Sequence, residues 1–265
     1  MRLLIVEGNS REIWQKREKY GGVPYHKRFM TMLKLLRPDA HLEVAFPADD
    51  DAVLPSVKSL RKFDGILWTG SSLYVNDPVS CDQQQLTFTE DVFVSGVPFY
   101  GSCWGLQLAV VVAGGKVSAC PKGREFGISA PVELTEAGKR TPYLQGRNKP
   151  YSALCIHMDE VVDLPENSTI LAGNSHSKVQ ALTIKNKNSE FFGVQYHPEF
   201  KISDMIFIAR YMSEILINDG VFASIADVEK FVSKLEKKEG LPESITNYLQ
   251  HIQEVNYWLQ YLMGS

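Results

Sequence analysis

The sequence has no long hydrophobic run and no strong excess of charge of either sign. No uninterrupted apolar stretch approaches the roughly 18–20 residues that are needed to cross a bilayer, and the N-terminal apolar run reaches Glu7 too early for a secretory signal peptide. The 28 basic and 31 acidic residues give a formal charge of −3, without the basic excess that binding to a phosphate backbone needs. The sequence therefore predicts a cytoplasmic protein that binds neither membranes nor nucleic acid.

Cysteine is scarce, with four residues among 265: Cys81, Cys103, Cys120 and Cys155. They include no Cys-x-x-Cys pair and are too few for a disulfide framework in a chain of this length. No Cys and His pair has zinc-finger spacing, so we expect no metal and no cofactor. Cys81 and Cys120 are expected to be structural, whereas one of the reduced thiols is a candidate nucleophile.

The first part of the chain alternates between short apolar runs and helical patterns. The strand candidates, which are bounded by turn residues, are 3–6, 42–46, 65–69 and 97–101. The helix candidates are 26–36, 52–61, 82–95 and 104–113. This alternation predicts an α/β fold with an open, mostly parallel sheet and helices on both of its faces.

Residues 9–28 contain many Lys and Arg, few aliphatic side chains and a Gly21-Gly22 pair. This composition predicts a mobile loop that leads into the first helix. The loop is either a solvated surface segment or a lid over a site.

From about residue 116 the pattern changes to shorter strand-like pieces, at 127–134, 154–156, 169–172, 179–184 and 191–195. A helix at 204–217 then closes an α/β domain of residues 1–219, and residues 220–265 form a C-terminal helical extension. Its apolar residues recur at helical spacing in one stripe, made of Ile245, Leu249, Ile252, Val255, Trp258, Leu259 and Leu262. Such a stripe must be covered, either by its own domain or by a homodimer or partner contact.

A candidate nucleophile lies in residues 101–107 (GSCWGLQ), where an apolar strand leads directly into a helical pattern. Strand, tight turn and helix are the context of a nucleophile elbow, and the glycines at 101 and 105 allow strand and helix to pass close together. Cys103 would then lie at a helix N-terminus, which favours the thiolate. An isolated Gly-x-Cys-x-Gly motif is as often an ordinary turn with a buried cysteine as it is a nucleophile elbow. A partner base therefore decides between these two interpretations.

Residues 195–199 (QYHPE) supply the candidate partners. Pro198 ends the preceding strand and leaves His197 and Glu199 in a loop, near Cys103 if this strand is parallel to the others. A thiol, an imidazole that accepts its proton and a carboxylate that orients the imidazole form an acyl-transfer site.

These two segments resemble the class I (triad) glutamine amidotransferases. Residues 123–127 (GREFG) and 157–161 (HMDEV), followed by Leu164-Pro165, resemble segments of the amidotransferase domain of GMP synthase and its stand-alone relatives. The resemblance covers residues 1 to about 200 and implies the flavodoxin-like fold of that family. It also implies that Cys103 attacks the side-chain amide of L-glutamine, that His197 acts as base and then acid, and that Glu199 orients His197.

The resemblance further implies an oxyanion hole and contacts to the substrate. The backbone of Trp104 would supply one N–H donor, and Gly70 or Ser71 the other, although Ser72 stands where the family usually has proline. The substrate contacts would come from Gln107, Gly105 and His157. Cys155 and His157 could be mistaken for a catalytic pair, but neither an elbow nor an orienting carboxylate accompanies them.

Three functions follow as alternatives. The first is a glutamine amidotransferase-type amidohydrolase that passes ammonia to a separate acceptor or synthetase, because the sequence contains no P-loop and little chain follows Glu199. The second is a γ-glutamyl hydrolase that acts on a γ-glutamylated amine by the same chemistry. The third is a catalytically silent regulatory or binding subunit.

Overall fold

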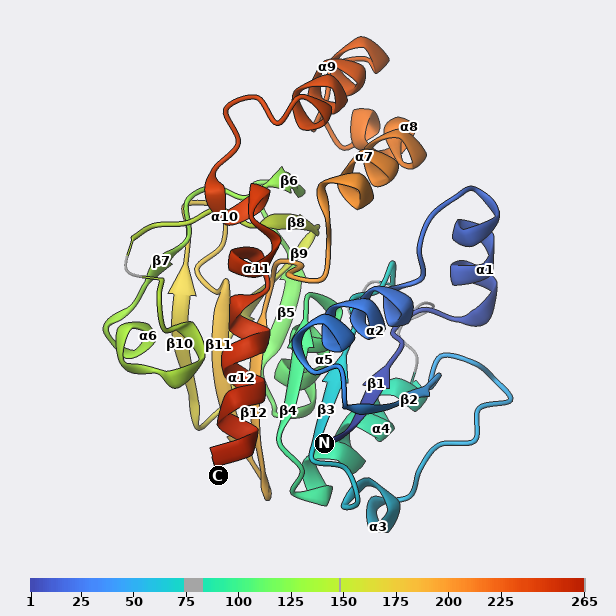
Figure 1. The fold of residues 1–265 in the computed structure, drawn as a ribbon, viewed down its shortest axis with the longest axis vertical. Coiled ribbons are helices and arrows are strands. Elements are labelled where there is room, and N and C mark those ends of the chain that lie inside the picture. Colours follow the sequence, from blue (N-terminus) through green and yellow to red (C-terminus); the bar gives the residue numbers. More distant parts are fainter. Residues whose placement is uncertain (74–82, 148, 265) are drawn as a thin grey trace.

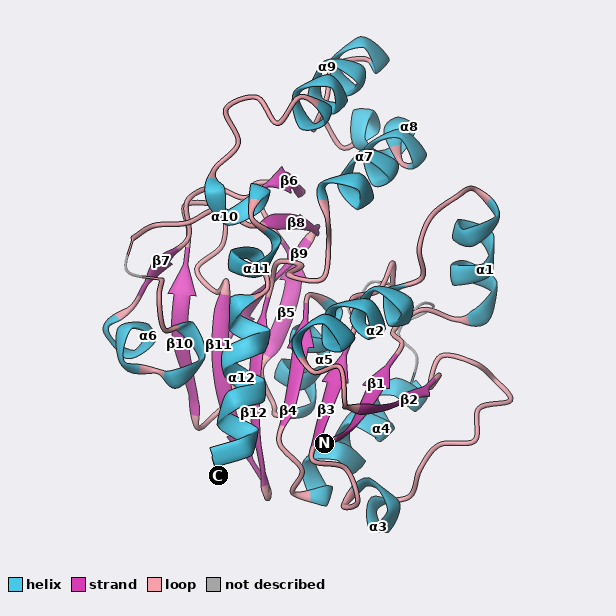
Figure 2. Ribbon diagram, viewed as in Figure 1, coloured by secondary structure: helices cyan, strands magenta, loops and turns pink. Residues whose placement is uncertain are grey.

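The computed structural model describes residues 1–73, 83–147 and 149–264, so Cys81 lies outside the described residues. Its centre is an eight-stranded sheet of order β2-β1-β3-β4-β12-β11-β10-β7 (Figures 1 and 2). The parallel part consists of β1 (Arg2–Val6), β2 (His41–Ala45), β3 (Gly65–Trp68), β4 (Phe99–Ser102) and β12 (Ser189–Val194). The prediction of an open, mostly parallel sheet is confirmed.

The remaining strands of this sheet run antiparallel to their neighbours. They are β7 (Glu133–Leu134), β10 (Ser168–Gly173) and β11 (Ala181–Asn186). Antiparallel neighbours can be joined by short turns rather than by helices, which explains why helical patterns fade in this part of the sequence.

Helices cover both faces of the sheet and form two apolar layers. In Figure 1, α2 (Tyr25–Leu36) and α12 (Gln253–Gly264) lie in front of the sheet, and α4 (Gln83–Ser95) and α5 (Trp104–Val112) lie behind it. The alternating side chains of β1 show the division, since Leu3 and Ile5 face the first layer and Leu4 and Val6 face the second.

Two small antiparallel sheets stand beside the large one. One pairs β5 (Lys116–Ala119) with β9 (Asp159–Asp163), and the other pairs β6 (Glu125–Ile128) with β8 (Leu154–His157). The predicted strand at 127–134 is wrong, because this segment is divided between β6 and β7. Neither β5 nor β9 was predicted, since both combine buried and exposed positions over only four or five residues.

The prediction of a loop at 9–28 is wrong, because residues Arg11–Lys19 form helix α1 and α2 begins at Tyr25. The predicted helix at 52–61 is also too long, since only α3 (Val57–Leu60) is helical there. The predicted helix at 204–217 is split into α7 (Ile202–Tyr211) and α8 (Ser213–Asn218). The short elements α6 (Glu136–Arg140) and η1 (Pro142–Leu144) complete the middle of the chain.

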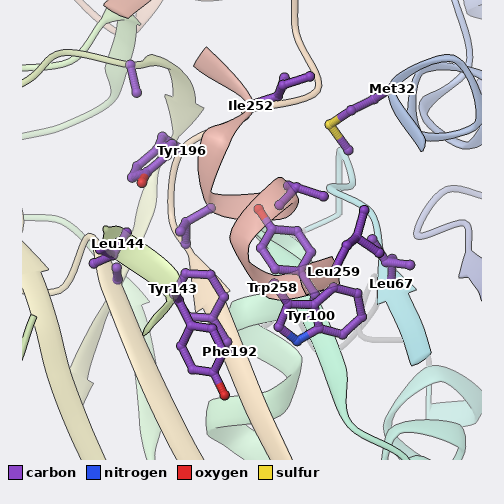
Figure 3. Packing of buried hydrophobic residues seen from close by; sticks show 14 of the residues in the cluster. Met32, Leu67, Tyr100, Tyr143, Leu144, Phe192, Tyr196, Ile252, Trp258 and Leu259 are labelled. Carbon is purple, nitrogen blue, oxygen red and sulfur yellow. The ribbon is translucent and has the colours of Figure 1, made fainter. Parts of the chain in front are cut away.

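The C-terminal segment contains α9 (Ile225–Glu236), α10 (Glu243–Thr246), α11 (Tyr248–His251) and α12. The expected stripe is therefore spread over three helices, and Leu249, at 61% exposed, does not belong to it. Ile252, Val255, Trp258 and Leu259 are buried in the same cluster as the sheet, and Figure 3 shows Trp258 beside Tyr100 of β4. The stripe is thus covered by its own domain, whereas the division at residue 219 stays a prediction.

Within the ranges that the structure describes, no helix combines the length and the apolar composition that crossing a membrane requires.

Candidate active site

Cys103 occupies a sharp turn between β4 and α5. Its backbone has φ 48° and ψ −100°, a conformation that costs free energy for any residue other than glycine and is common at functional sites. A Cβ atom on Gly101 would lie 2.6 Å from the carbonyl carbon of Gly105, and one on Gly105 would lie 2.7 Å from the Cβ of Trp68. Both glycines are therefore required for the close approach of strand and helix. Gly105, predicted to contact the substrate, is placed here against Trp68.

The loop after β12 lies at the same edge of the sheet as Cys103. β12 pairs with β4 in parallel, with Val194 opposite Ser102, and the N–H of Cys103 donates to the carbonyl of Val194 over 2.8 Å. The carboxyl ends of the two strands therefore meet, as the sequence predicted. His197 and Glu199 follow directly, and both are 1% exposed.

His197 and Glu199 form a buried pair, with 2.7 Å between Nδ1 and Oε1. Burial lowers the pKa of His197, but the Glu199 carboxylate and the Cys103 sulfur raise it well above its usual range. The other ring nitrogen, Nε2, has no hydrogen-bond partner among the described residues. The imidazole is thus oriented through Nδ1 and has Nε2 available for the thiol or for a substrate.

The imidazole ring is also held by its neighbours. Phe200 stacks on it with 4.1 Å between ring centroids, and the Tyr25 ring of α2 lies at 5.9 Å. A Cβ atom on Gly70 would lie 2.6 Å from Cε1 of the imidazole, so the β3 turn passes directly beside the ring.

Two C-terminal helices support the loop that carries His197. His251 of α11 lies with Nε2 3.1 Å from the carbonyl oxygen of His197, and Tyr248 donates to the carbonyl of Glu199 over 3.5 Å. Below them, Glu254 of α12 accepts from Tyr196 and from Arg147, each over 2.9 Å. All of these contacts join segments more than 40 residues apart in the chain.

The turn after β3 meets the N-terminus of α5, where oxyanion donors were predicted. Ser71 and Trp104 line the pocket around Cys103. The N–H of Ser72 donates to Oδ1 of Asn9 over 2.9 Å, and the hydroxyl of Ser71 lies 3.3 Å from the same atom. The backbone N–H groups of Ser71 and Trp104 donate to no acceptor within the described ranges.

Asn9 is fixed in turn by Glu7, at the carboxyl end of β1. One carboxylate oxygen of Glu7 accepts from the backbone and side chain of Asn9, and the other accepts from the backbone N–H of His26 and contacts its Nδ1. This network was not predicted from the sequence. The sequence feature that could have revealed it is Glu7, a charged residue that directly follows the apolar run of β1 at a sheet edge where ligands bind.

The pocket at Cys103 contains two of the predicted substrate contacts, Gln107 and His157. Gln107 donates through Nε2 to the carbonyl of Asp159 over 3.3 Å. His157 is committed on both ring nitrogens, at 2.9 Å to Glu125 and 3.0 Å to the carbonyl of Asp159. Burial raises the pKa of Glu125, but His157 lowers it, so the net pKa is below its usual range.

Three further polar or charged residues line this pocket and were not predicted: Arg17, Tyr25 and Arg124. Asp159, in the segment 157–161 that carries the family resemblance, was expected with His157 near the rim of the site and also lines the pocket. Arg124 donates through Nε to Asp219 over 2.7 Å. Asp159 is buried, and its Oδ2 has no partner among the described residues. Burial raises the pKa of Asp159, whereas His157 and Arg124 lower it to a smaller extent.

The other described cysteines are placed differently. Cys155 is fully buried on β8, and burial raises the pKa of its thiol well above the usual range. A thiol of this kind is poorly nucleophilic, in agreement with the rejection of a Cys155 and His157 pair. Within the described ranges, no group of three or more His, Cys, Asp or Glu side chains is arranged to hold a metal ion.

The protein has an α/β fold in which a cysteine turn, a histidine and a carboxylate meet at one edge of the sheet, the combination that thiol-dependent acyl transfer requires. Residues 40–207 match the model of the family described as "Glutamine amidotransferase class-I". The match spans more than half of the sequence, and the chain belongs to this family. The family resemblance found in the sequence is thereby confirmed.

Two relatives illustrate the range of the family. The chain is 34% identical to a γ-glutamyl-L-1-hydroxyisopropylamide hydrolase of Pseudomonas sp., over 86% of this chain and 78% of the relative. It is 33% identical to a glutamine-hydrolyzing GMP synthase subunit of Sulfolobus acidocaldarius, over 69% of this chain and 87% of the relative. Both relatives are enzymes that act by hydrolysis, according to their names.

Solved structures show the same fold at low identity. A glutamine amidotransferase of Thermotoga maritima superposes with a TM-score of 0.69 at 16% identity, over 97% of this chain and 98% of the other. A glutamine amidotransferase of Methylobacillus flagellatus gives a TM-score of 0.64 at 16% identity, over 98% and 94%.

Proposed function

We propose that this protein hydrolyses the side-chain amide of a γ-glutamyl compound through a thioester on Cys103. The observation that carries the proposal is the position of His197, which Glu199 orients through Nδ1 and whose Nε2 has no partner among the described residues. A catalytically silent protein would not need this buried charged pair beside a strained cysteine, since burying charges is costly.

The first step forms the thioester. His197 accepts the thiol proton, the sulfur of Cys103 attacks the amide carbon, and a tetrahedral oxyanion forms. The C–N bond then breaks while His197 gives the proton to the departing nitrogen, so ammonia or an amine leaves. The raised pKa of His197 favours the protonated ring that this second transfer needs.

The second step consumes water. His197 takes a proton from a water molecule, whose oxygen attacks the thioester carbon, and the C–S bond breaks as the sulfur regains a proton. The products are glutamate and the free enzyme, with no oxidant, reductant or metal in the balance.

The oxyanion is stabilised by the N–H groups of Trp104 and Ser71. Both residues line the pocket, and Asn9 holds the turn by accepting from Ser72. Gly70 was the alternative donor, but it packs beside His197 and is not part of the lining. Loss of one such donor typically lowers kcat by about 10²–10³-fold.

The glutamyl head group binds on the side of Gln107 and Asp159. The unpartnered Oδ2 of Asp159 is a buried carboxylate oxygen, and an α-ammonium group would satisfy it. Gln107 holds the Asp159 segment in place through the backbone carbonyl.

Two substrates fit this chemistry. A γ-glutamylated amine is favoured by the similarity to the Pseudomonas hydrolase, which extends over 86% of this chain. Free L-glutamine, with ammonia passed to a separate synthetase, is the second candidate and is favoured by the GMP synthase relative.

The experiment is labelling with a chloroketone analogue of glutamine, followed by peptide mass spectrometry. We expect one adduct, on Cys103, and parallel loss of glutaminase and γ-glutamyl amidase activity. Cys103→Ala should remain unlabelled. An adduct on Cys155 with Cys103 unmodified would overturn the assignment.

A further inference from the structure

Helix α1 buries one residue, and that residue is a cation. Among its nine residues only Arg17 is buried, while the aliphatic and aromatic side chains Ile13 and Trp14 are only partly covered. Surface helices usually bury an apolar stripe, and isolated buried cations are costly unless an anion compensates them. The burial of Arg17 therefore needs an explanation other than packing.

The position of Arg17 is fixed from two sides. Its Nη2 donates to the hydroxyl of Ser72 over 2.6 Å, and its guanidinium lies 5.1 Å from the centre of the Tyr25 ring. Its backbone carbonyl accepts from Gly22, and a Cβ atom on Gly22 would lie 2.5 Å from the ring of Phe207 in α7. The end of α1 is thus held against α7, with the guanidinium in the pocket lining.

No carboxylate of the described residues lies within ion-pair distance of Arg17. The carboxylate that acts on it electrostatically is Glu7, whose two oxygens are already committed to Asn9 and His26. The guanidinium therefore has donors available for an anion inside the pocket.

Tyr25 links Arg17 to the imidazole of His197. His197 gives its proton to the leaving nitrogen, so that nitrogen must come next to the imidazole. Tyr25 contacts both the His197 ring, at 5.9 Å, and Arg17. Asp159 of β9 and Gln107 of α5, which we place at the glutamyl head group, contact each other instead.

Among the described residues, the lining holds two guanidinium groups, of Arg17 and Arg124, and one carboxylate, of Asp159. Arg124 also donates to Asp219, whereas Arg17 has no carboxylate partner in these ranges. Glutamine brings one carboxylate and one ammonium group, whereas a γ-glutamyl amino acid brings two carboxylates and one ammonium group. The second carboxylate is carried by the leaving amine.

We infer that Arg17 forms a leaving-group subsite that binds the carboxylate of an amino acid, and that γ-glutamyl amino acids are the substrate class. This inference rests on the proposed function, since it uses the proton transfer from His197. Arg17 is a specificity residue in this scheme and takes no part in bond breaking.

The test compares two substrates of similar size, γ-glutamylglycine and γ-glutamylethylamide, on Arg17→Met and on Lys16→Met. Lys16 is exposed on the same helix and serves as the matched control. We expect Arg17→Met to lower kcat/KM for γ-glutamylglycine by about 10- to 100-fold, mainly through KM, because a charge-assisted contact is lost. The values for the ethylamide and for glutamine should change less than about threefold, and Lys16→Met should match the unsubstituted protein.

Equal losses on all substrates would overturn the inference, because the guanidinium would then act on a group common to them all. Equal kcat/KM values of the unsubstituted protein for the two γ-glutamyl compounds would also overturn it. Arg17→Lys, which keeps the charge, should retain part of the preference and replaces Arg17→Met if thermal unfolding shows that variant to be unfolded. Absence of any turnover or Cys103 adduct would instead reject the proposed function.

Discussion

Nε2 of His251 lies 3.1 Å from the backbone carbonyl of His197, although the two residues are 54 positions apart. The imidazole of His251 is buried between this carbonyl and that of Ser244, which lies 3.1 Å from Nδ1. The C-terminal segment therefore determines the backbone position of the residue that we propose as the catalytic base.

We predict that His251→Ala lowers kcat roughly tenfold with a smaller change in KM, because a buried acceptor in the catalytic loop loses its donor. Leu249→Ala, at an exposed position of the same helix, is the matched control and should leave both constants unchanged. A rise in KM alone would contradict a positioning role.

The same histidine makes stability depend on pH. Burial lowers the pKa of His251 below its ordinary 6.5, so the unfolded chain binds its proton more readily than the folded protein does. The contribution of the buried His251 side chain to the free energy of unfolding is fully present above about pH 6.5 and is lost as the pH falls. Chemical denaturation between pH 5 and 8 should therefore show a steeper acid loss for the unsubstituted protein than for His251→Gln. Identical slopes would mean that His251 does not titrate in this range.

Substitutions of the proposed triad should be strongly non-additive. Cys103→Ala and His197→Ala should each lower kcat by roughly 10⁴-fold or more, and Glu199→Gln should retain roughly 10²-fold more activity than either. The Cys103 and His197 double variant should be little worse than each single variant, since the groups act as a unit. Losses that multiply in steady-state assays would contradict a shared mechanism.

Glu199→Gln should also move the pH profile. The Glu199 carboxylate raises the pKa of His197, and a neutral amide removes that charge, so the pKa falls. The protonated ring that donates to the leaving nitrogen is then lost at lower pH, and the alkaline limb of kcat shifts toward neutrality. An unchanged alkaline limb would show that another group controls it.

Trp258 should be a major source of stability. It is 1% exposed, and its ring lies 5.9 Å from that of Tyr100. Trp258→Ala should lower the free energy of unfolding by about 3–5 kcal/mol, without a change in oligomeric state by light scattering. Met263→Ala, on the exposed side of the same helix, should have little effect. A changed mass with unchanged stability would instead assign α12 to an interface.

The sequence predicts the parallel half of the sheet and the elbow because both follow local rules. A short apolar run followed by Gly-x-Cys-x-Gly leaves few alternatives, since Gly101 and Gly105 are sterically required. The position of His197 follows from one further assumption, that β12 is parallel to β4, which the register bears out.

Other parts have no comparable signal. Helix α1 was missed because hydrophobic periodicity cannot detect a helix whose only buried side chain is Arg17. The support from His251 acts on a backbone carbonyl, which is the same in every residue and leaves no pattern in the sequence. Glu254, although charged, is fully buried on α12 beneath Tyr196, and only the packed structure shows why.

The contacts of α11 and α12 with the His197 loop also order events during synthesis. Translation produces Cys103 and His197 well before residues 251–259, and a domain generally folds as a unit. A nascent chain that ends before His251 has the thiol and the imidazole but lacks the donor that fixes the loop. We therefore expect hydrolysis to reach its full rate only after residues 248–259 have been made and have packed against this loop.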